Sequence, residues 1–127
     1  MQTLLLSLAF AAVPCLVASE DPSPQHVQWM KETGALNGKI RKGEDVEASA
    51  KRLAALYKDV AVFWSPRSET GKKTTADIQS GADALAKAAA AGDAAGVAAA
   101  SRTIGGSCRT CHDTHREKIS ETEYKIK

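Results

Sequence analysis

Two cysteines and a histidine near the C-terminal end are the residues of this sequence best suited to chemistry. They form the run Cys108-Arg109-Thr110-Cys111-His112. Residues three and four positions apart share one face of a helix, so both thiols and the imidazole point the same way. Two thiols placed like this can add to the two vinyl groups of a haem while the imidazole reaches its iron. Cys-x-x-Cys-His is the attachment pattern of c-type haem. We therefore predict one covalent haem c, with its iron bound by His112.

Other uses of the two cysteines fit the sequence less well. A thioredoxin-like dithiol opens a helix after a strand, whereas this pair falls deep in the last predicted helix. A zinc site would need a second Cys or His pair at ligand spacing, and the sequence offers none that is apparent. A structural disulfide across so short a spacing would not explain His112. Covalent haem attachment accounts for all three residues.

The elements that must position these residues are helices. Four amphipathic segments separated by turn signals predict an all-α chain, and no run of alternating β-branched residues competes with them. The expected helix starts, each with a capping side chain, are Ser23-Pro24, Asp45, Thr74 and Asp93. The polar segment from Arg67 to Lys73 is expected to be a loop. Short connections favour antiparallel neighbours, so the predicted fold is an antiparallel four-helix bundle with the haem near its C-terminal end.

Composition suggests a single domain with space inside it. The chain has 127 residues, of which 43% are hydrophobic but only 5% aromatic. Much of the hydrophobic fraction is alanine, so we expect a core that needs a large group to fill it. The net charge of +2 is mild, which gives no reason to predict nucleic acid or another polyanion as a partner.

The beginning of the chain predicts export. Residues 1–19 carry no charged side chain, and an apolar run from Leu4 to Ala18 is followed by small residues that suit signal peptidase. The run is shorter than the roughly 20 apolar residues of a membrane span. Pro14 makes a poor lipobox before Cys15, which argues against a lipid anchor. We predict a signal peptide over 1–19, a four-helix domain over 20–127, a periplasmic location and no transmembrane segment in the mature chain.

The segment from Gly105 to Arg116 is similar to the C-terminal haem motif of the cytochrome c prime family, which consists of four-helix cytochromes. The run Asn37-Gly38-Lys39-Ile40 resembles the end of that family's first helix, and the resemblance covers essentially the whole mature chain. It implies one covalent haem, Arg116 as the basic residue beside the proximal histidine, and Met30 at the distal haem position.

The distal position implies the function. In the family, high-spin members leave it open for gases, and a low-spin branch has methionine there in a Met-Lys-x-x-Gly context. Met30-Lys31-Glu32-Thr33-Gly34 resembles the second kind. Ligation by histidine and methionine raises the reduction potential of a cytochrome. We therefore predict an electron-transfer protein serving redox partner proteins, with iron bound by His112 and Met30. The alternative is a five-coordinate protein that binds nitric oxide or carbon monoxide.

Several further expectations can be compared with the structure. His115 replaces the family's usual aromatic residue and is expected to pack near the haem. His26 stands where the family's first helix often has arginine, and we expect it to be partly exposed and to touch a haem propionate. No catalytic acid–base pair or substrate pocket is visible, so no enzymatic activity is predicted. The sequence leaves open whether the first two helices pair two chains into a homodimer.

Overall fold

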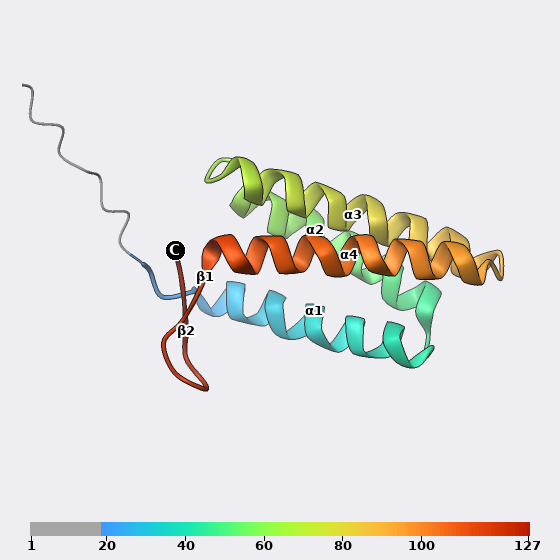
Figure 1. Ribbon diagram of the computed structural model, residues 1–127, viewed down its shortest axis with the longest axis horizontal. Coiled ribbons are helices and arrows are strands. Elements are labelled where there is room, and N and C mark those ends of the chain that lie inside the picture. The colour runs from blue at the N-terminus through green and yellow to red at the C-terminus, as the bar shows by residue number, and fades with distance from the viewer. Residues whose placement is uncertain (1–18) are drawn as a thin grey trace, which may run out of the picture.

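The computed structural model describes residues 19–127, so the predicted signal peptide lies outside the described residues except for Ser19. Its four helices are α1 (Pro24–Lys42), α2 (Val46–Trp64), α3 (Glu69–Ala90) and α4 (Ala94–His115). Consecutive helices run antiparallel (Figure 1), which confirms the predicted all-α four-helix bundle. A hairpin of β1 (Arg116–Lys118) and β2 (Tyr124–Ile126) follows α4. Within residues 19–127, no helix is both long enough and apolar enough to cross a bilayer.

The predicted starts of α1 and α4 are confirmed by their capping bonds. The Ser23 hydroxyl accepts a hydrogen bond from the His26 backbone N–H, and Pro24 occupies the first turn of α1. The Asp93 carboxylate accepts from the Gly96 N–H at the start of α4. Each bond satisfies a backbone donor that the first turn of a helix would otherwise leave without a partner.

The predicted capping role of Asp45 is wrong, although α2 does begin directly after it. Its side chain makes no capping bond, and its φ of 45° lies in the left-handed region. Gly43 before it also has a left-handed φ, of 73°, so the connection from α1 to α2 is a tight turn. In this turn the Asp45 carboxylate lies 4.0 Å from the Lys39 ammonium instead of over the helix end.

The predicted start of α3 is also wrong, because the helix begins at Glu69, within the expected loop. Ser68 caps it by accepting a hydrogen bond from the Gly71 N–H at 3.0 Å. Thr74, the expected cap, donates to the Thr70 carbonyl inside the helix at 2.8 Å. An added Cβ at Gly71 would lie 2.9 Å from Cε3 of Trp64, so the glycine lets the first turn of α3 pack tightly on the end of α2.

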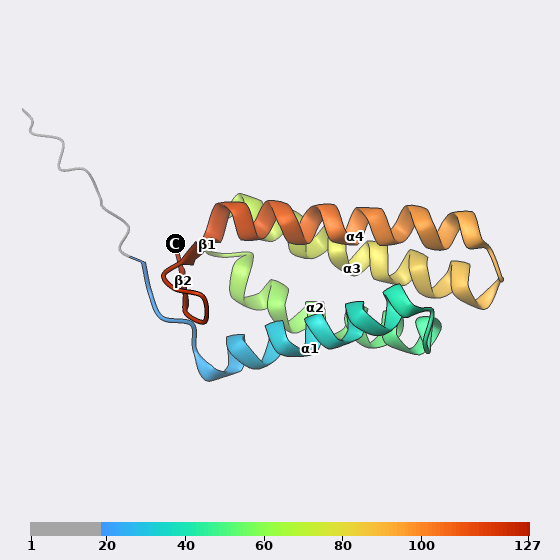
Figure 2. The ribbon, with the colours of Figure 1, turned by 60° about the horizontal axis from the view of Figure 1, so that its bottom comes forward.

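The core is built mainly from α2, α3 and α4. The buried apolar side chains of the described residues are Ala50, Leu53, Ala54, Leu56, Tyr57, Val60, Trp64, Ile78, Ala82, Leu85, Ala86, Ala100 and Ile104. None of them comes from α1, whose buried residues are His26 and Thr33. The alanines let α2, α3 and α4 approach closely. By contrast, α1 packs mainly on α2, and its direct contact with α4 is marginal (Figure 2).

Candidate haem-binding site

A cavity of about 740 Å³ lies inside the bundle, lined by side chains of all four helices and of the C-terminal hairpin. Its volume is within the range of roughly 300 to 1,000 Å³ that is usual for small-molecule and cofactor sites. Apolar side chains from α2 and α3, including Val60 and Ile78, form part of its wall. The alanine-rich sequence predicted room for a large group, and the structure contains that room.

Cys108 and Cys111 line the cavity from α4, and neither forms a disulfide within the described part of the chain. Burial raises the pKa of both thiols, and the neighbouring Cys111 raises that of Cys108 further. The neighbouring hydroxyls of Tyr57 and Thr74 oppose these pKa shifts at Cys108 and Cys111, respectively. A redox dithiol needs a lowered thiol pKa, so this environment does not favour thioredoxin-like chemistry.

His112 lines the same cavity, and protein atoms leave much of its side chain uncovered. Burial in the cavity wall lowers the pKa of the imidazole, and the Arg116 guanidinium lowers it further, while Asp113 acts in the opposite direction. The ring is therefore neutral at pH 7, which is the form in which histidine binds metals. Within residues 19–127, no group of three or more His, Cys, Asp and Glu side chains converges as a metal site of its own.

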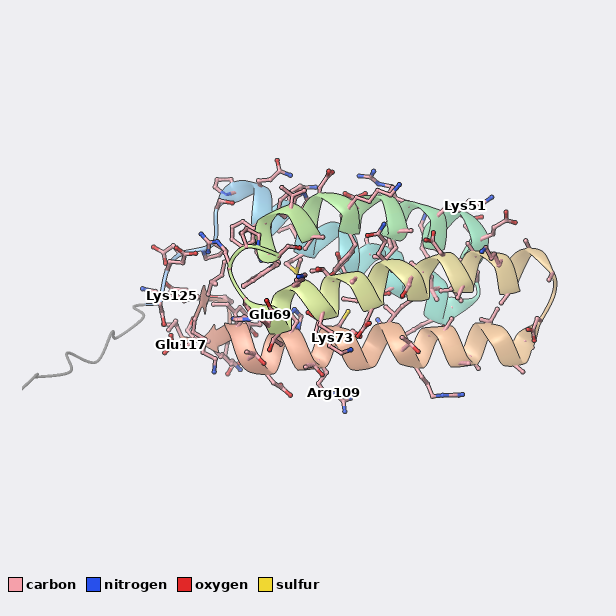
Figure 3. All side chains as sticks on the ribbon, turned by 90° about the horizontal axis from the view of Figure 1, so that it is seen from above. Lys51, Glu69, Lys73, Arg109, Glu117 and Lys125 are labelled. Carbon is pink, nitrogen blue, oxygen red and sulfur yellow. The ribbon has the colours of Figure 1, made fainter. Side chains whose placement is uncertain are left out.

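Met30 lines the cavity from α1, the helix that faces α4 across it. Its side chain is partly buried and packs against the edge of the core. Arg116 reaches the cavity at the end of α4, where its guanidinium lies 3.5 Å from the ring centre of Tyr124. The structure thus brings every predicted site residue to one cavity. Arg109, inside the motif, is exposed and points away from the bundle (Figure 3).

The expectation of a partly exposed His26 is wrong, because only 8% of this residue is exposed. Its ring lies in an aromatic cage, with ring centres 6.0 Å from Trp29, 5.1 Å from Phe63 and 5.9 Å from Trp64. Burial lowers the pKa of His26, as do the charges of Arg67 and His112, whereas the Glu20 carboxylate raises it. Three aromatic side chains from two helices therefore cover a residue whose sequence position alone gave no sign of burial.

The cage also fixes which nitrogen of His26 carries the proton. Nδ1 is buried and has no hydrogen-bond partner among the described residues. Buried N–H groups without a partner are rarer in proteins than buried acceptors without one. Because the neutral ring has a single N–H, we assign its proton to Nε2 on hydrogen-bonding grounds. Nε2 is then the nitrogen free to donate into the cavity that His26 lines.

His115 also lines the cavity, and its ring is held by three contacts. Nδ1 lies 2.9 Å from the Lys127 carbonyl oxygen, Nε2 lies 2.8 Å from the Ser68 hydroxyl, and the ring centre is 4.5 Å from that of Trp64. A carbonyl can only accept, so Nδ1–H donates to Lys127, while Nε2 and the Ser68 hydroxyl form the second hydrogen bond. His115 therefore ties α4 to the start of α3 and to the end of the hairpin. The sequence contained no signal for this role.

An up-down-up-down bundle with Cys-x-x-Cys-His on its last helix, facing a large cavity, defines a four-helix cytochrome of the c type. The family described as cytochrome c′ matches residues 64–116. A cytochrome c′ of Pararhodospirillum photometricum is 44% identical over 57 residues, which are 45% of this chain and 45% of that relative. These matches support the cytochrome c′ family, whose members carry one covalently attached haem c with its iron.

The two matches cover only part of the chain. The residues matched by the family include Cys108, Cys111, His112 and Arg116 but not α1, so Met30 lies outside them. The match spans less than half the length of the curated relative. No solved structure matches the chain significantly.

Proposed function

We propose that this chain is an exported, periplasmic mono-haem cytochrome that carries single electrons between redox partner proteins. Cys108 and Cys111 hold the haem by thioether bonds, His112 binds the iron from α4, and Met30 binds it from α1. When bound, the haem supplies a ferric/ferrous couple of one electron. The observation that most supports the proposal is that these four side chains line one cavity from two facing helices.

The side chains around the cavity suit this role. A thioether and an imidazole together raise the reduction potential of haem iron relative to other axial ligand sets. Apolar side chains such as Val60 and Ile78 keep water from the interior of the cavity, and such a shell also tunes redox potential. Arg116 offers the cavity a guanidinium, which pairs well with carboxylates such as haem propionates.

Met30 suits the iron better than His26, although both lie on α1 and line the cavity. A metal-binding histidine normally donates its second ring N–H to an acceptor. Binding through Nε2 of His26 would put that N–H on Nδ1, which is buried without an acceptor among the described residues. A thioether has no N–H to satisfy and binds iron without this cost.

Visible spectra of both oxidation states test the iron ligands. We expect the ferrous wild type to be low-spin and to bind carbon monoxide slowly, since the thioether must leave first. Met30→Ala should become high-spin, bind carbon monoxide faster and have a lower reduction potential. Leu36→Ala trims another partly buried side chain of α1 that does not line the cavity, so it should keep the wild-type spectrum. His26→Phe should stay low-spin as well.

Two outcomes of these spectra would contradict the proposal. A ferrous wild type that is already high-spin, and unchanged by Met30→Ala, would instead support the five-coordinate gas-binding alternative, with which the family is equally compatible. Loss of the low-spin spectrum in His26→Phe but not in Met30→Ala would assign the ligand to His26.

The mass of the intact protein tests whether haem is covalently attached to it. Protein made in a host with haem-attachment machinery should exceed the mass of its polypeptide by one haem, and acid-acetone should not extract the haem. Replacing both Cys108 and Cys111 by serine should release it, whereas the neighbouring change Ser107→Ala should not. Extractable haem in the wild type would refute the thioether bonds.

A further inference from the structure

The two helices that face each other across the cavity are linked by a small sheet rather than by their own packing. Direct contact between α1 and α4 is marginal. At one end of the bundle, β2 pairs with β1 on one side and with Glu20 on the other. The Glu20 N–H donates to the Ile126 carbonyl at 2.8 Å, and the Ile126 N–H donates to the Glu20 carbonyl at 2.8 Å. Glu20 leads into α1 and β1 continues α4, so the sheet joins the two helices.

This sheet covers part of the cavity. We call residues 19–22 together with β1, β2 and their connecting loop the clasp. Asp21, Pro22 and the stretch from Thr122 to Ile126 all line the cavity that Met30 and His112 also line. Glu117 and Lys125 lie at the end of the bundle where α1 begins (Figure 3). The clasp therefore lies between solvent and one end of the cavity.

The hairpin side of the clasp is held firmly to α4. The Lys127 N–H donates to the His115 carbonyl at 2.8 Å, and Nδ1 of His115 donates back to the Lys127 carbonyl at 2.9 Å. The Arg116 guanidinium stacks on Tyr124 at 3.5 Å. Ile126 packs against the edge of the core. These contacts fix β2 relative to α4.

The α1 side of the clasp is held more weakly. Apart from the paired backbone bonds of Glu20, it depends on a hydrogen bond from the Ser19 hydroxyl to the Glu117 carboxylate and on surface charges: Asp21 lies 3.7 Å from Lys125, and Glu20 pairs with Arg67. Exposed ion pairs contribute little to stability. Segments with few buried contacts open locally far more often than the whole protein unfolds. The junction between Glu20 and Ile126 is therefore the part of the clasp that separates first.

We propose that the clasp gates the cavity: separation of Glu20 from Ile126 lets residues 19–22 move away from the hairpin and admits small uncharged molecules such as diatomic gases. The start of α1 stays in place, because His26 and Trp29 are held against Phe63 and Trp64 of α2. The proposal rests on the haem site proposed above, and the clasp acts on access to that site whether or not Met30 binds iron.

Two matched pairs of variants in the haem-loaded protein test the gate. Glu20→Pro removes the N–H that donates to Ile126, while Glu20→Ala keeps it and loses the same ion pair with Arg67. Ile126→Pro removes the opposite N–H, while Ile126→Ala keeps it and loses most of the same side chain. We compare association of carbon monoxide with the ferrous protein, and hydrogen exchange of the other N–H of the Glu20–Ile126 pairing, within each pair.

Each proline variant should bind carbon monoxide about fivefold faster than its alanine partner, the ratio expected for losing one backbone hydrogen bond of the closed form. Exchange of the N–H that remains in the Glu20–Ile126 pairing should accelerate by a similar factor, and this readout does not depend on redox activity. Equal rates within both pairs would overturn the gate, as would faster exchange without faster binding. A high-spin wild-type spectrum would refute ligation by Met30 but leave the ratio within each pair unaffected.

Discussion

Replacing Gly71 by alanine should destabilise the folded protein by disturbing Trp64. An added Cβ would lie 2.9 Å from Cε3 and 3.0 Å from Cβ of this tryptophan. Trp64 is buried against His26, Phe63 and His115, with ring centres 5.9, 5.1 and 4.5 Å away, so it has little room to withdraw. Overpacking of this kind costs about 1–3 kcal/mol, whereas Gly→Ala inside a helix gains about 1 kcal/mol. We expect a net loss of up to about 2 kcal/mol.

Gly38 on α1 provides the matched control. An added Cβ there would meet no other atom within 4 Å, so Gly38→Ala should stabilise the protein by up to about 1 kcal/mol through helix propensity. The assay is urea unfolding of the haem-loaded proteins at one pH, followed by far-ultraviolet circular dichroism. The two variants should differ by about 1 to 3 kcal/mol in free energy of unfolding, because helix propensity contributes to both and overpacking only to Gly71→Ala. A Gly71→Ala variant as stable as Gly38→Ala would refute the reasoning.

Three further predictions concern the core, a helix cap and pH. Leu53→Ala, at a fully buried position of α2, should cost about 2–5 kcal/mol in urea unfolding, and a loss under 1 kcal/mol would contradict the assigned core. Ser68→Ala removes both the α3 cap and the partner of His115 and should cost about 1–2 kcal/mol, while the exposed control Ser80→Ala should be nearly neutral. Burial lowers the pKa of His26 below its ordinary 6.5. Just below pH 6.5 the unfolded chain therefore binds more protons than the folded protein, so the free energy of unfolding falls as the pH falls. His26→Gln should lose less stability than the wild type between pH 7 and pH 5, and equal losses would show that His26 does not contribute to the pH dependence.

The bundle was predictable from the sequence wherever short-range patterns determine the structure. Leu53, Leu56 and Val60 follow a helical stripe, and all three are buried. The capping side chains of Ser23 and Asp93 accept hydrogen bonds from backbone N–H groups three residues later in the chain. The local sequence was therefore enough to predict these caps. The start of α3 was missed because the prediction gave the cap to a threonine with an aspartate three residues later. The serine that actually caps α3 bonds to the N–H of a glycine that fits against Trp64 at the end of α2.

In the site, too, the residues set by short-range spacing were predictable and those set by contacts between helices were not. Cys108, Cys111 and His112 share one helical turn, so their common face follows from spacing alone. Placing Met30 opposite them needed a resemblance to known cytochromes, since nothing local links α1 to α4. The burial of His26 depends on aromatic residues of α2, and the hairpin depends on pairing with Glu20, about a hundred residues earlier in the chain. Such long-range contacts leave no periodic signal in a single sequence.

The aromatic cage has a practical consequence for observing this protein. Trp29 and Trp64 are the two tryptophans of the chain. Trp64 lines the cavity, and Trp29 lies against the ring of His26, which lines it too. A haem absorbs light at the wavelengths that tryptophan emits. The fluorescence of both tryptophans should therefore be quenched while the cavity holds a haem. Their emission should brighten when the cavity is empty or the chain unfolds. The protein therefore carries its own optical reporter of cofactor loading, readable without a label.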